Sequence, residues 1–402
     1  PRLHALTEVG APDGSHRYFT YDSAGRLSGT SRDATAEAMT FTYAATGVVT
    51  AANALGHASR TFFDQRGLLA KNENALGQQV HLTFDEDYNL TKLTDPLGQS
   101  SSYAYDDQGN LVRSTDTAGH MTRFAFGAPF NRLASVTDAN GNLTRYAYTT
   151  AGNLESITYA DGSHESWGYD SVGNPTSWSN RRGHAVSYTH DSAGRLTGKV
   201  FVDGASAAYS YDSHGNLTRA ATLDASSAIV RSADIAYDAN DRLTRLTDQS
   251  GRYLAFTYDA GGRRATSLDQ LGHQLTYHYD AAGRLEYLTD ESNVEVVRYR
   301  YDGAGRLDRK TLGNGVYSTY EYDAAGQLLT LTNFSASDAV LSRLAYTYDS
   351  LGRRTGMTTL DGAWTYEYDT VGQLTHAVFA STNASIPDQD LTYVYDALGN
   401  RS

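Results

Sequence analysis

The sequence has no cysteine, only six prolines among 402 residues, and no apolar run long enough for a transmembrane helix. Disulfides are therefore excluded, although the lack of cysteine does not decide the cellular compartment. Basic residues are also scarce, because 33 Lys and Arg stand against 46 Asp and Glu and give a formal net charge of −13. A nucleic-acid partner requires a basic surface for its phosphates, so the charge argues against one.

The ends of the chain lack the usual marks of a beginning and an end. The first residue is Pro1 rather than Met, no signal peptide follows, and Ser402 comes one step after a turn. We therefore expect an internal segment of a longer protein. No shift in composition and no Pro/Ser-rich linker divides the sequence, so we expect residues 1–402 to form one array rather than two or three domains.

What the sequence does contain is one short stretch, repeated. Residues 279–285 read Tyr-Asp-Ala-Ala-Gly-Arg-Leu, and close copies start at Tyr21 and Tyr301. Eighteen copies begin at residues 21, 43, 63, 84, 105, 126, 148, 169, 190, 211, 237, 258, 279, 301, 322, 348, 368 and 395. Most steps are 20 to 22 residues, and three are 26 or 27. A fixed period of this kind indicates a tandem repeat architecture.

Each copy predicts a β-hairpin. The first aromatic residue, here called the anchor, ends a strand, and Asp-x-x-Gly then supplies a tight turn in which Gly takes a positive φ. Leu six residues after the anchor starts the return strand. We expect the following residues to define the repeat: Tyr21, Asp22, Gly25, Tyr105, Asp106, Gly109, Tyr211, Asp212, Gly215, Tyr279, Asp280, Gly283, Tyr301, Asp302, Gly305, Tyr322, Asp323 and Gly326.

A second glycine, seven residues before most anchors, marks another turn that joins consecutive hairpins. The two turns together account for 27 of the 37 glycines. The sequence therefore predicts an all-β meander of about 36 short strands. In the three long steps the extra residues fall in this second turn, on one edge of the sheet, where inserted loops often contact a neighbouring part.

A flat sheet of this width is not stable as such, because strand twist curls or splits sheets beyond about ten strands. Rolled into a single ring, about 36 strands give a diameter of roughly 55 Å, too wide for side chains to fill. We expect one long antiparallel sheet wound into a hollow spiral shell. A β-propeller is the alternative, because two units of 21 residues match a common blade length, but alternate units do not differ as inner and outer hairpins should.

Large rings two residues before the anchor lie on the same side of the strand as the anchor, because side chains alternate. These rings form a candidate surface for a ligand or for a cargo polypeptide. They are Tyr103, Tyr146, Trp167, Tyr188, Tyr209, Tyr277, Tyr299, Tyr320, Tyr346 and Tyr366, here called the minus-two ladder. Two roles for these rings remain as alternatives: stacking on sugars, or packing against side chains of neighbouring strands.

Eighteen tandem copies of the Tyr-Asp-x-x-Gly-Arg-Leu pattern resemble the RHS/YD-repeat family over essentially the whole chain. The resemblance implies a spiral β-shell. In bacterial RHS toxins and the cocoon component of Tc toxins such a shell encloses a toxic C-terminal polypeptide, and in teneurins it serves as an extracellular adhesion scaffold. By resemblance we expect a secreted or cell-surface bacterial shell whose partners are an encapsulated toxin and capping domains of the same chain. The alternative is an extracellular scaffold that binds a carbohydrate or a receptor.

The sequence offers no enzyme motif, and we expect neither catalysis nor a cofactor. Family members that carry a toxin end their shell with an Asp-Pro-x-Gly-Leu signature, but residues 95–99 read Asp-Pro-Leu-Gly-Gln and coincide with an ordinary second turn. His57, His120, His184 and His273 share one repeat position, yet other units place Gln, Asn, Ser or Arg there. We therefore interpret these histidines as polar turn residues rather than metal ligands. Arg five residues after the anchor can pair with Asp at plus one or with a neighbouring turn, and we interpret this position mainly as part of a solvated outer rim.

Overall fold

The computed structural model describes residues 5–128 and 130–401; residues 1–4, 129 and 402 lie outside the described part, so the ends of the predicted array are not covered. The described residues form 36 β-strands and a three-residue 3-10 helix, η1 (Asp33–Thr35). The first half contains β1(Glu8–Gly10), β2(His16–Tyr21), β3(Leu27–Arg32), β4(Met39–Tyr43), β5(Val48–Asn53), β6(Ala58–Phe63), β7(Leu69–Glu73), β8(Gln79–Phe84), β9(Leu90–Thr94), β10(Ser100–Tyr105), β11(Leu111–Thr115), β12(Met121–Gly127), β13(Arg132–Thr137), β14(Leu143–Tyr148), β15(Leu154–Thr158), β16(His164–Tyr169), β17(Pro175–Ser179) and β18(Ala185–His190).

The second half contains β19(Leu196–Phe201), β20(Ser206–Tyr211), β21(Leu217–Leu223), β22(Ile229–Tyr237), β23(Leu243–Asp248), β24(Tyr253–Tyr258), β25(Arg264–Asp269), β26(Gln274–Tyr279), β27(Leu285–Thr289), β28(Glu295–Tyr301), β29(Leu307–Leu312), β30(Tyr317–Tyr322), β31(Leu328–Phe334), β32(Val340–Tyr348), β33(Arg354–Thr358), β34(Gly362–Tyr368), β35(Leu374–Ser381) and β36(Gln389–Thr392). All of them belong to one 36-stranded sheet in which chain neighbours pair antiparallel. The predicted all-β meander is confirmed.

The turn after each anchor explains the hairpin. In the copy at Tyr279, the Gly283 N–H donates to Asp280 O at 2.9 Å and the Asp280 N–H donates to Arg284 O at 2.8 Å. Gly283 has φ +77°, a left-handed conformation that costs glycine little. The ladder then shifts register between His278 and Tyr279, which is the bulge expected after such a turn. Where a copy lacks the glycine, another residue adopts the same conformation, as Tyr88 does at φ +69°.

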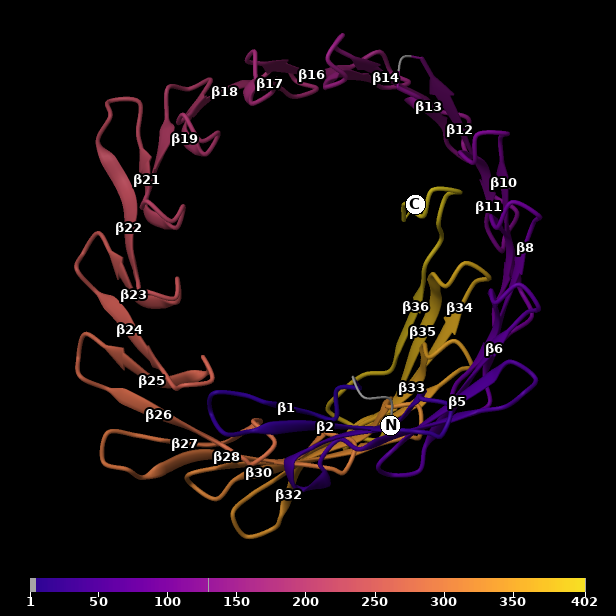
Figure 1. Ribbon diagram of the computed structural model, residues 1–402, viewed down its shortest axis with the longest axis vertical. Coiled ribbons are helices and arrows are strands. Elements are labelled where there is room, and N and C mark those ends of the chain that lie inside the picture. Colours follow the sequence, from indigo (N-terminus) through magenta and orange to yellow (C-terminus); the bar gives the residue numbers. More distant parts are fainter. Residues whose placement is uncertain (1–4, 129, 402) are drawn as a thin grey trace.

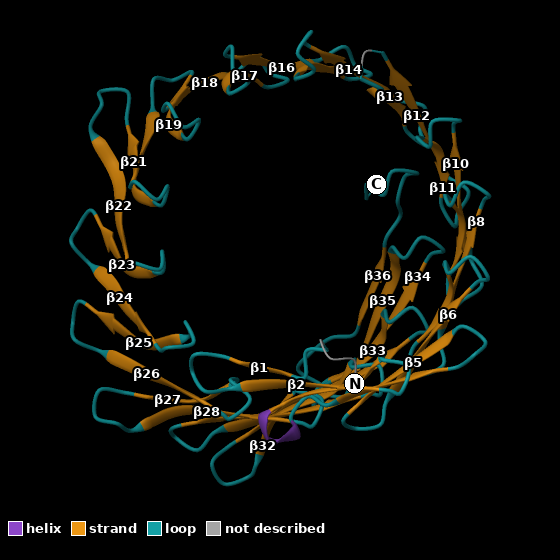
Figure 2. Cartoon of the chain, viewed as in Figure 1, coloured by secondary structure: helices purple, strands orange, loops and turns teal. Residues whose placement is uncertain are grey.

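The sheet curves into a ring and passes its own beginning (Figure 1). Strands and loops alternate around the whole circumference, and β27–β33 run along the same side as β1–β5 (Figure 2). The C-terminal strands β34–β36 lie inside the outline of the ring in this view. The wall is therefore an open spiral rather than a closed barrel, and nothing in it corresponds to the separate blades of a propeller.

Successive turns of the spiral touch along a seam, in which anchor turns of the later strands rest on second turns of the earlier strands. Arg263 Nη1 lies 2.8 Å from Asp13 Oδ2, and the Asp13 side chain is only 7% exposed. Arg32 Nη1 donates to Ala282 O at 2.9 Å. A Cβ built on Gly261 would lie 2.8 Å from Asp13, so the close approach at this point requires glycine.

The same contact recurs along the seam at constant register. Thr117 Oγ1 donates to Thr370 O at 2.5 Å, and Asn140 hydrogen bonds to Asp396. Asp13 lies between β1 and β2, and its partner Arg263 lies between β24 and β25, which is a separation of 23 strands. The separation is the same for Thr117, between β11 and β12, and Thr370, between β34 and β35. A wall of 23 strands at ~4.8 Å spacing has a circumference of ~110 Å and a diameter of ~35 Å.

The ring is narrower than the ~55 Å expected for all strands in one circle, because the sheet overlaps itself. Side-chain layers of ~5 Å on the inner face leave a free width of ~25 Å. No side chain of the described residues is completely buried, and only twelve of these residues, three of them glycines, are buried at all. The wall is therefore a single sheet without a packed core on either face.

Candidate functional site

The arginine after each anchor turn joins two neighbouring repeats. Asp302 Oδ1 accepts hydrogen bonds from the N–H groups of Ala304 and Arg306, each at 2.9 Å, and Arg306 Nε donates to Asp302 Oδ2 at 2.8 Å. Arg306 Nη1 then donates to Asp323 O in the next repeat at 3.0 Å. Its guanidinium carbon lies 4.6 Å from the centre of the Tyr322 ring, within cation–π range.

This clamp between Asp, Arg and the next Tyr recurs along the wall. The Arg–Tyr ring pairs are Arg26–Tyr43, Arg195–Tyr211, Arg242–Tyr258, Arg263–Tyr279, Arg284–Tyr301, Arg306–Tyr322 and Arg353–Tyr368, at 4.3 to 4.9 Å. The arginines of the clamp are half-buried rather than fully solvated in most copies. The interpretation of this position as a solvated rim was wrong, because the partner ring belongs to the following hairpin.

In the copies at Asp22 and Asp302 the clamp also lowers the pKa of the carboxylate. Both the backbone N–H and the guanidinium of Arg26 donate to the Asp22 carboxylate. Partial burial would raise the pKa of Asp22, but these hydrogen bonds outweigh it, so the pKa lies below its ordinary value. Burial alone would raise the pKa of Asp302, but the N–H and guanidinium of Arg306 outweigh burial and the pKa is lowered. These aspartates are therefore ionised turn acceptors, in keeping with the structural role proposed for Asp22 and Asp302 among the repeat-defining residues.

The tyrosine at the anchor is a second link between repeats. Tyr322 Oη donates to Leu307 O of the preceding hairpin at 3.0 Å, and burial raises the pKa of Tyr322. All fourteen anchor tyrosines donate to a backbone oxygen in this way; they are Tyr21, Tyr43, Tyr105, Tyr148, Tyr169, Tyr211, Tyr237, Tyr258, Tyr279, Tyr301, Tyr322, Tyr348, Tyr368 and Tyr395. Their hydroxyl groups are thus engaged in hydrogen bonds within the sheet.

The minus-two ladder is different. Its side chains are half-buried, apart from Tyr346, which is 8% exposed. Within the described residues, only one of the ten has a hydrogen-bond partner, the Tyr277 hydroxyl, which lies 3.4 Å from the Ser267 hydroxyl. The ladder therefore presents rings whose polar groups are not used by the fold.

Half of the cross-strand neighbours of the minus-two ladder are aliphatic, and the other five are Ser114, Trp178, Lys199, Lys310 and Met357. Tyr146 pairs with Ile157, and Tyr320 pairs with Leu331. Consecutive ladder positions are two strands apart, or about 10 Å. The result is a band of rings and aliphatic groups that follows the sheet, with a free hydrogen-bonding group at each step. Such a band can hold an extended chain weakly at many points.

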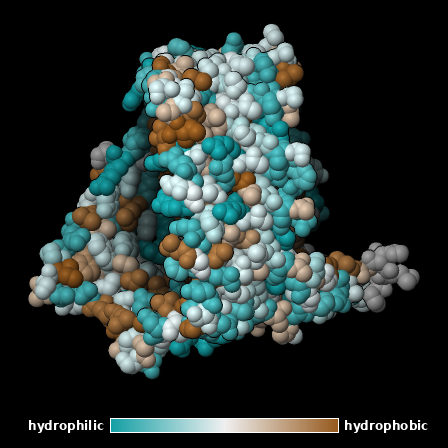
Figure 3. Space-filling view, turned by 90° about the vertical axis from the view of Figure 1, so that its left-hand side faces the viewer, coloured by the Kyte–Doolittle hydropathy of each residue, from teal (hydrophilic) through white to brown (hydrophobic). Residues whose placement is uncertain are grey.

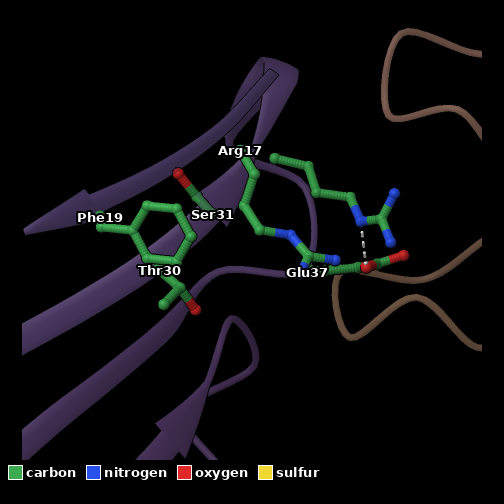
Figure 4. Close-up of a pocket in the computed structure, with 6 residues that line it drawn as sticks. Arg17, Phe19, Thr30, Ser31 and Glu37 are labelled. Atoms are coloured by element: carbon green, nitrogen blue, oxygen red, sulfur yellow. Dashed lines mark ion pairs between the residues drawn. The ribbon is translucent and has the colours of Figure 1, made fainter. Parts of the chain in front are cut away.

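A small cleft of about 150 Å³ lies at the start of the wall, beside the ladder position of Phe19 (Figure 4). Arg17 and Arg32 face each other across β2 and β3, and Arg32 Nε lies 2.8 Å from Glu37 Oε2. Sequence analysis missed this group, although the irregular segment around η1 was a signal for it. Arg32 is paired with Glu37 and donates to Ala282 O across the seam, so these two charges serve the contact between turns of the spiral, and the cleft shows no catalytic arrangement.

The residues considered for metal or autoproteolytic chemistry are turn residues. The His57 and His120 N–H groups donate to Asn53 and Asp116 at the start of their own turns, and His184 and His273 do the same in theirs. Gly98 N–H donates to Asp95 O at 2.9 Å, as in any second turn. Among the residues that the structure describes, no cluster of three or more His, Asp or Glu could hold a metal ion. No helix within the described part of the chain has the length and apolar character needed to cross a membrane.

Comparison with known proteins agrees with this geometry. The teneurin YD-shell family model matches residues 175–318, and the RHS repeat model matches residues 84–123, 129–164 and 301–338. No curated protein matches the sequence.

Solved Tc toxins share the fold. The Photorhabdus luminescens Tc holotoxin pore carrying TccC3-D651A aligns at TM-score 0.62 and 16% identity, and TcdB2-TccC3 without its hypervariable C-terminal region aligns at TM-score 0.61 and 18% identity. Each match covers 96% of this chain but 25% of the other, so the chain spans about a quarter of the length of those proteins. The predicted fold and the predicted resemblance to the RHS/YD-repeat family are confirmed.

Proposed function

We propose that this chain is the wall of an encapsulating shell in a bacterial secreted toxin of the RHS type, with a toxic C-terminal polypeptide as its cargo. The observation that carries the proposal is the seam. It turns a repetitive sheet into a tube with a free width of ~25 Å, wide enough for an unfolded or partly folded chain. The similarity of the fold to Tc toxins that contain TccC3 supports the same use.

The minus-two ladder would supply the contacts with cargo. Its unpartnered hydroxyls and rings bind weakly and without sequence preference, because each step offers only one ring and one hydrogen bond. Weak retention at many points keeps a chain inside without folding it. We further propose that residues 1–402 act as one array, that the wall has no catalytic role, and that the intact protein works outside the producing cell with capping domains of its own chain.

The test uses the full-length protein and measures how fast a protease cuts the C-terminal polypeptide. Gly261→Gln places a long side chain against Asp13 and should open the seam, so we expect cleavage at least tenfold faster than in the unchanged protein. Ala193→Gln is the matched control, because Ala193 holds the same turn position outside the seam and is exposed. Equal protection in both variants, or no protection in the unchanged protein, would contradict the proposal.

A second candidate is an extracellular scaffold that binds a carbohydrate or a receptor. The ladder favours it, because most of its hydroxyls have no partner among the described residues and sugars stack on aromatic faces and bond to hydroxyls. Saturable binding of a defined glycan that is lost in Tyr188→Ala and Tyr209→Ala, with the protease protection unchanged, would support this candidate over the container.

A further inference from the structure

The face of the sheet opposite the minus-two ladder carries a row of basic side chains on strands β7–β14. Residues three before an anchor lie on this face because they alternate with the ladder, and residues eight after an anchor pair with them across the strands. The row, here called the basic stripe, consists of Lys71, His81, Lys92, Arg113, Arg123 and Arg145. The only acidic residue in these eight strands is Glu73, which already pairs with Arg60 at 3.1 Å.

The basic stripe has no ionic partner within the described part of the chain. Lys92, Arg113, Arg123 and Arg145 are exposed. The acidic side chains of this part of the sequence lie in the turns at the two edges of the wall, where aspartates such as Asp106 accept backbone N–H groups. The middle of the wall is therefore positively charged here, in a chain whose formal net charge is −13.

Two arginines of the basic stripe lie directly opposite each other. Arg113 on β11 is the cross-strand partner of Arg123 on β12. Side chains in this relation have Cβ atoms about 5 Å apart, so like charges there destabilise the sheet. Further along the chain the same two repeat positions hold Arg219 and Asp234, which form an ion pair at 2.6 Å. The repeat can therefore build a salt bridge at this point, and the basic stripe does not use it.

The basic stripe has clear limits along the wall. On β15–β20 the corresponding positions hold uncharged residues, namely Ser156, Ser166, Ser177, Ser187, Gly198 and Ala208. Figure 3 shows the side of the ring where β21–β26 lie, and hydrophilic and hydrophobic residues are mixed on it. From β21 onward, the arginines at these two repeat positions each lie against an acid or an aromatic ring; they are Arg219, Arg245, Arg298 and Arg309.

The curvature of the basic stripe favours a flexible linear partner. Strands β7–β14 follow one arc of the ring (Figure 1) and make up eight of the 23 strands of a circuit, about a third. At ~4.8 Å per strand the stripe is roughly 34 Å long. A flat surface such as a membrane would touch only a few strands of this arc, whereas a flexible chain can follow all of them.

The side chains around the basic cations favour a polypeptide over a nucleic acid or a sugar. Small residues such as Ser102, Ala104 and Ala125 separate the cations, and no Phe, Tyr or Trp shares this face on β7–β14. The nearest ring on it, Phe62 of β6, is covered by Lys71, whose Nζ lies 3.8 Å from the ring centre. Single-stranded nucleic acids bind largely by stacking on exposed rings. Carboxylates bind guanidinium groups through paired hydrogen bonds and need no ring.

We propose that the basic stripe binds an acidic segment of a polypeptide, which lies extended across strands β7–β14. About ten extended residues cover its length. Arg113 and Arg123 contribute most, because a carboxylate between their two guanidinium groups removes the repulsion present in the free sheet. The like-charged pair is thus unfavourable for the sheet alone and favourable for the complex.

Fluorescence anisotropy of a labelled peptide of about twelve glutamates, about 40 Å long when extended, tests the proposal. We expect saturable binding at about 0.1 M salt, where charges act over about 10 Å. Arg123→Asp should weaken binding at least tenfold and raise the urea midpoint, because it creates the pair that Arg219 forms with Asp234. Arg123→Lys should stay within threefold of the unchanged protein.

Arg245→Asp is the matched control. Arg245 is exposed and lies eight residues after an anchor but outside the basic stripe, so the variant makes the same change in net charge and should leave the affinity unchanged. The proposal is wrong if the glutamate peptide does not bind saturably, or if Arg245→Asp and Arg123→Asp weaken binding equally.

Two further results would overturn the proposal. One is a lower urea midpoint or unfolding in Arg123→Asp, because the arginine pair would then serve the fold. The other is displacement of the glutamate peptide by tighter binding of heparin or of a thymidine oligonucleotide of similar length. That outcome would assign the basic stripe to a sulfated sugar or to a nucleic acid instead of a polypeptide.

Discussion

A disulfide between residues 54 and 303 would join two turns of the spiral that are distant in sequence. A Cβ built on Gly303 lies 3.7 Å from the Cβ of Ala54, inside the 3.5–4.5 Å range of Cβ distances in disulfides. Gly303 does not have a positive φ, so a cysteine can replace it without backbone strain. The chain has no cysteine of its own, so the double variant Ala54→Cys/Gly303→Cys contains one possible bond.

The expected stabilisation follows from the loop that the bond closes. Residues 54 and 303 enclose about 249 residues, and the loop-entropy relation gives about 5 kcal/mol for a loop of that size at 25 °C. Leu55 Cδ2 lies 3.1 Å from the new Cβ and must shift slightly, which subtracts from this value. We therefore expect a clear rise in the urea midpoint of the oxidised variant. Unfolding is measured by the fluorescence of Trp167, Trp178 and Trp364.

The bond itself is detected by free-thiol titration and by migration under non-reducing denaturing conditions. Ala54→Cys/Ala324→Cys is the control, because Ala324 holds the same turn position one repeat further along, about 10 Å away and beyond disulfide reach. Oxidation of the 54–303 pair but not of the 54–324 pair would support the register. If the control pair oxidised as readily, or the 54–303 pair stayed reduced, the separation of 23 strands would be wrong.

Three further predictions concern the links between repeats. Tyr322→Phe should cost about 1 kcal/mol of unfolding free energy, because it removes the hydrogen bond to Leu307 O. Tyr320→Phe should be near neutral, since the Tyr320 hydroxyl has no partner among the described residues. Equal losses of the two variants in urea titrations would refute the distinction. Arg306→Lys should cost about 1–2 kcal/mol through loss of the planar clamp on Asp302 and Tyr322, while Arg300→Lys, on a more exposed arginine, should cost less than about 0.5 kcal/mol. Stability should also fall in acid: the pKa values of Asp22, Asp191, Asp238 and Asp302 are lowered in the folded chain, so their contribution is complete above the unfolded carboxyl pKa of about 3.9 and is lost as pH falls through the lowered values. Urea midpoints that stay level from pH 5 to pH 2 would contradict this.

The local structure could be predicted from the sequence because it depends on neighbouring residues. The glycine after Asp280 specifies a turn, the spacing specifies a hairpin, and the absence of a break specifies a continuous sheet. The strand count and the spiral follow from these features together with twist. The anchor residues and the minus-two ladder were expected on one face of the sheet, but the sequence did not distinguish the use of their hydroxyls: the anchor hydroxyls bond to backbone oxygens, and those of the ladder mostly do not.

The register of the seam could not be predicted, because it depends on the accumulated curvature of 23 strands. A small change in curvature per strand would place Arg263 beside another turn. One signal was present: the first four anchor turns of the seam have only Gly or Ala at their two middle positions, residues 260–261, 281–282, 303–304 and 324–325, a combination that no earlier anchor turn has. Pairing of the clamp arginine with its turn Asp was open from the sequence, but its contact with the Tyr ring was not expected, since that ring lies in the next hairpin.

Because the seam joins turn to turn and not strand to strand, the circumference and the length of the tube are determined independently of each other. Curvature fixes how many strands complete a circuit. Each additional repeat of about 21 residues only carries the wall further along its axis. The internal volume of the tube therefore grows in proportion to the number of repeats, and whole units can be gained or lost without redesigning any one of them.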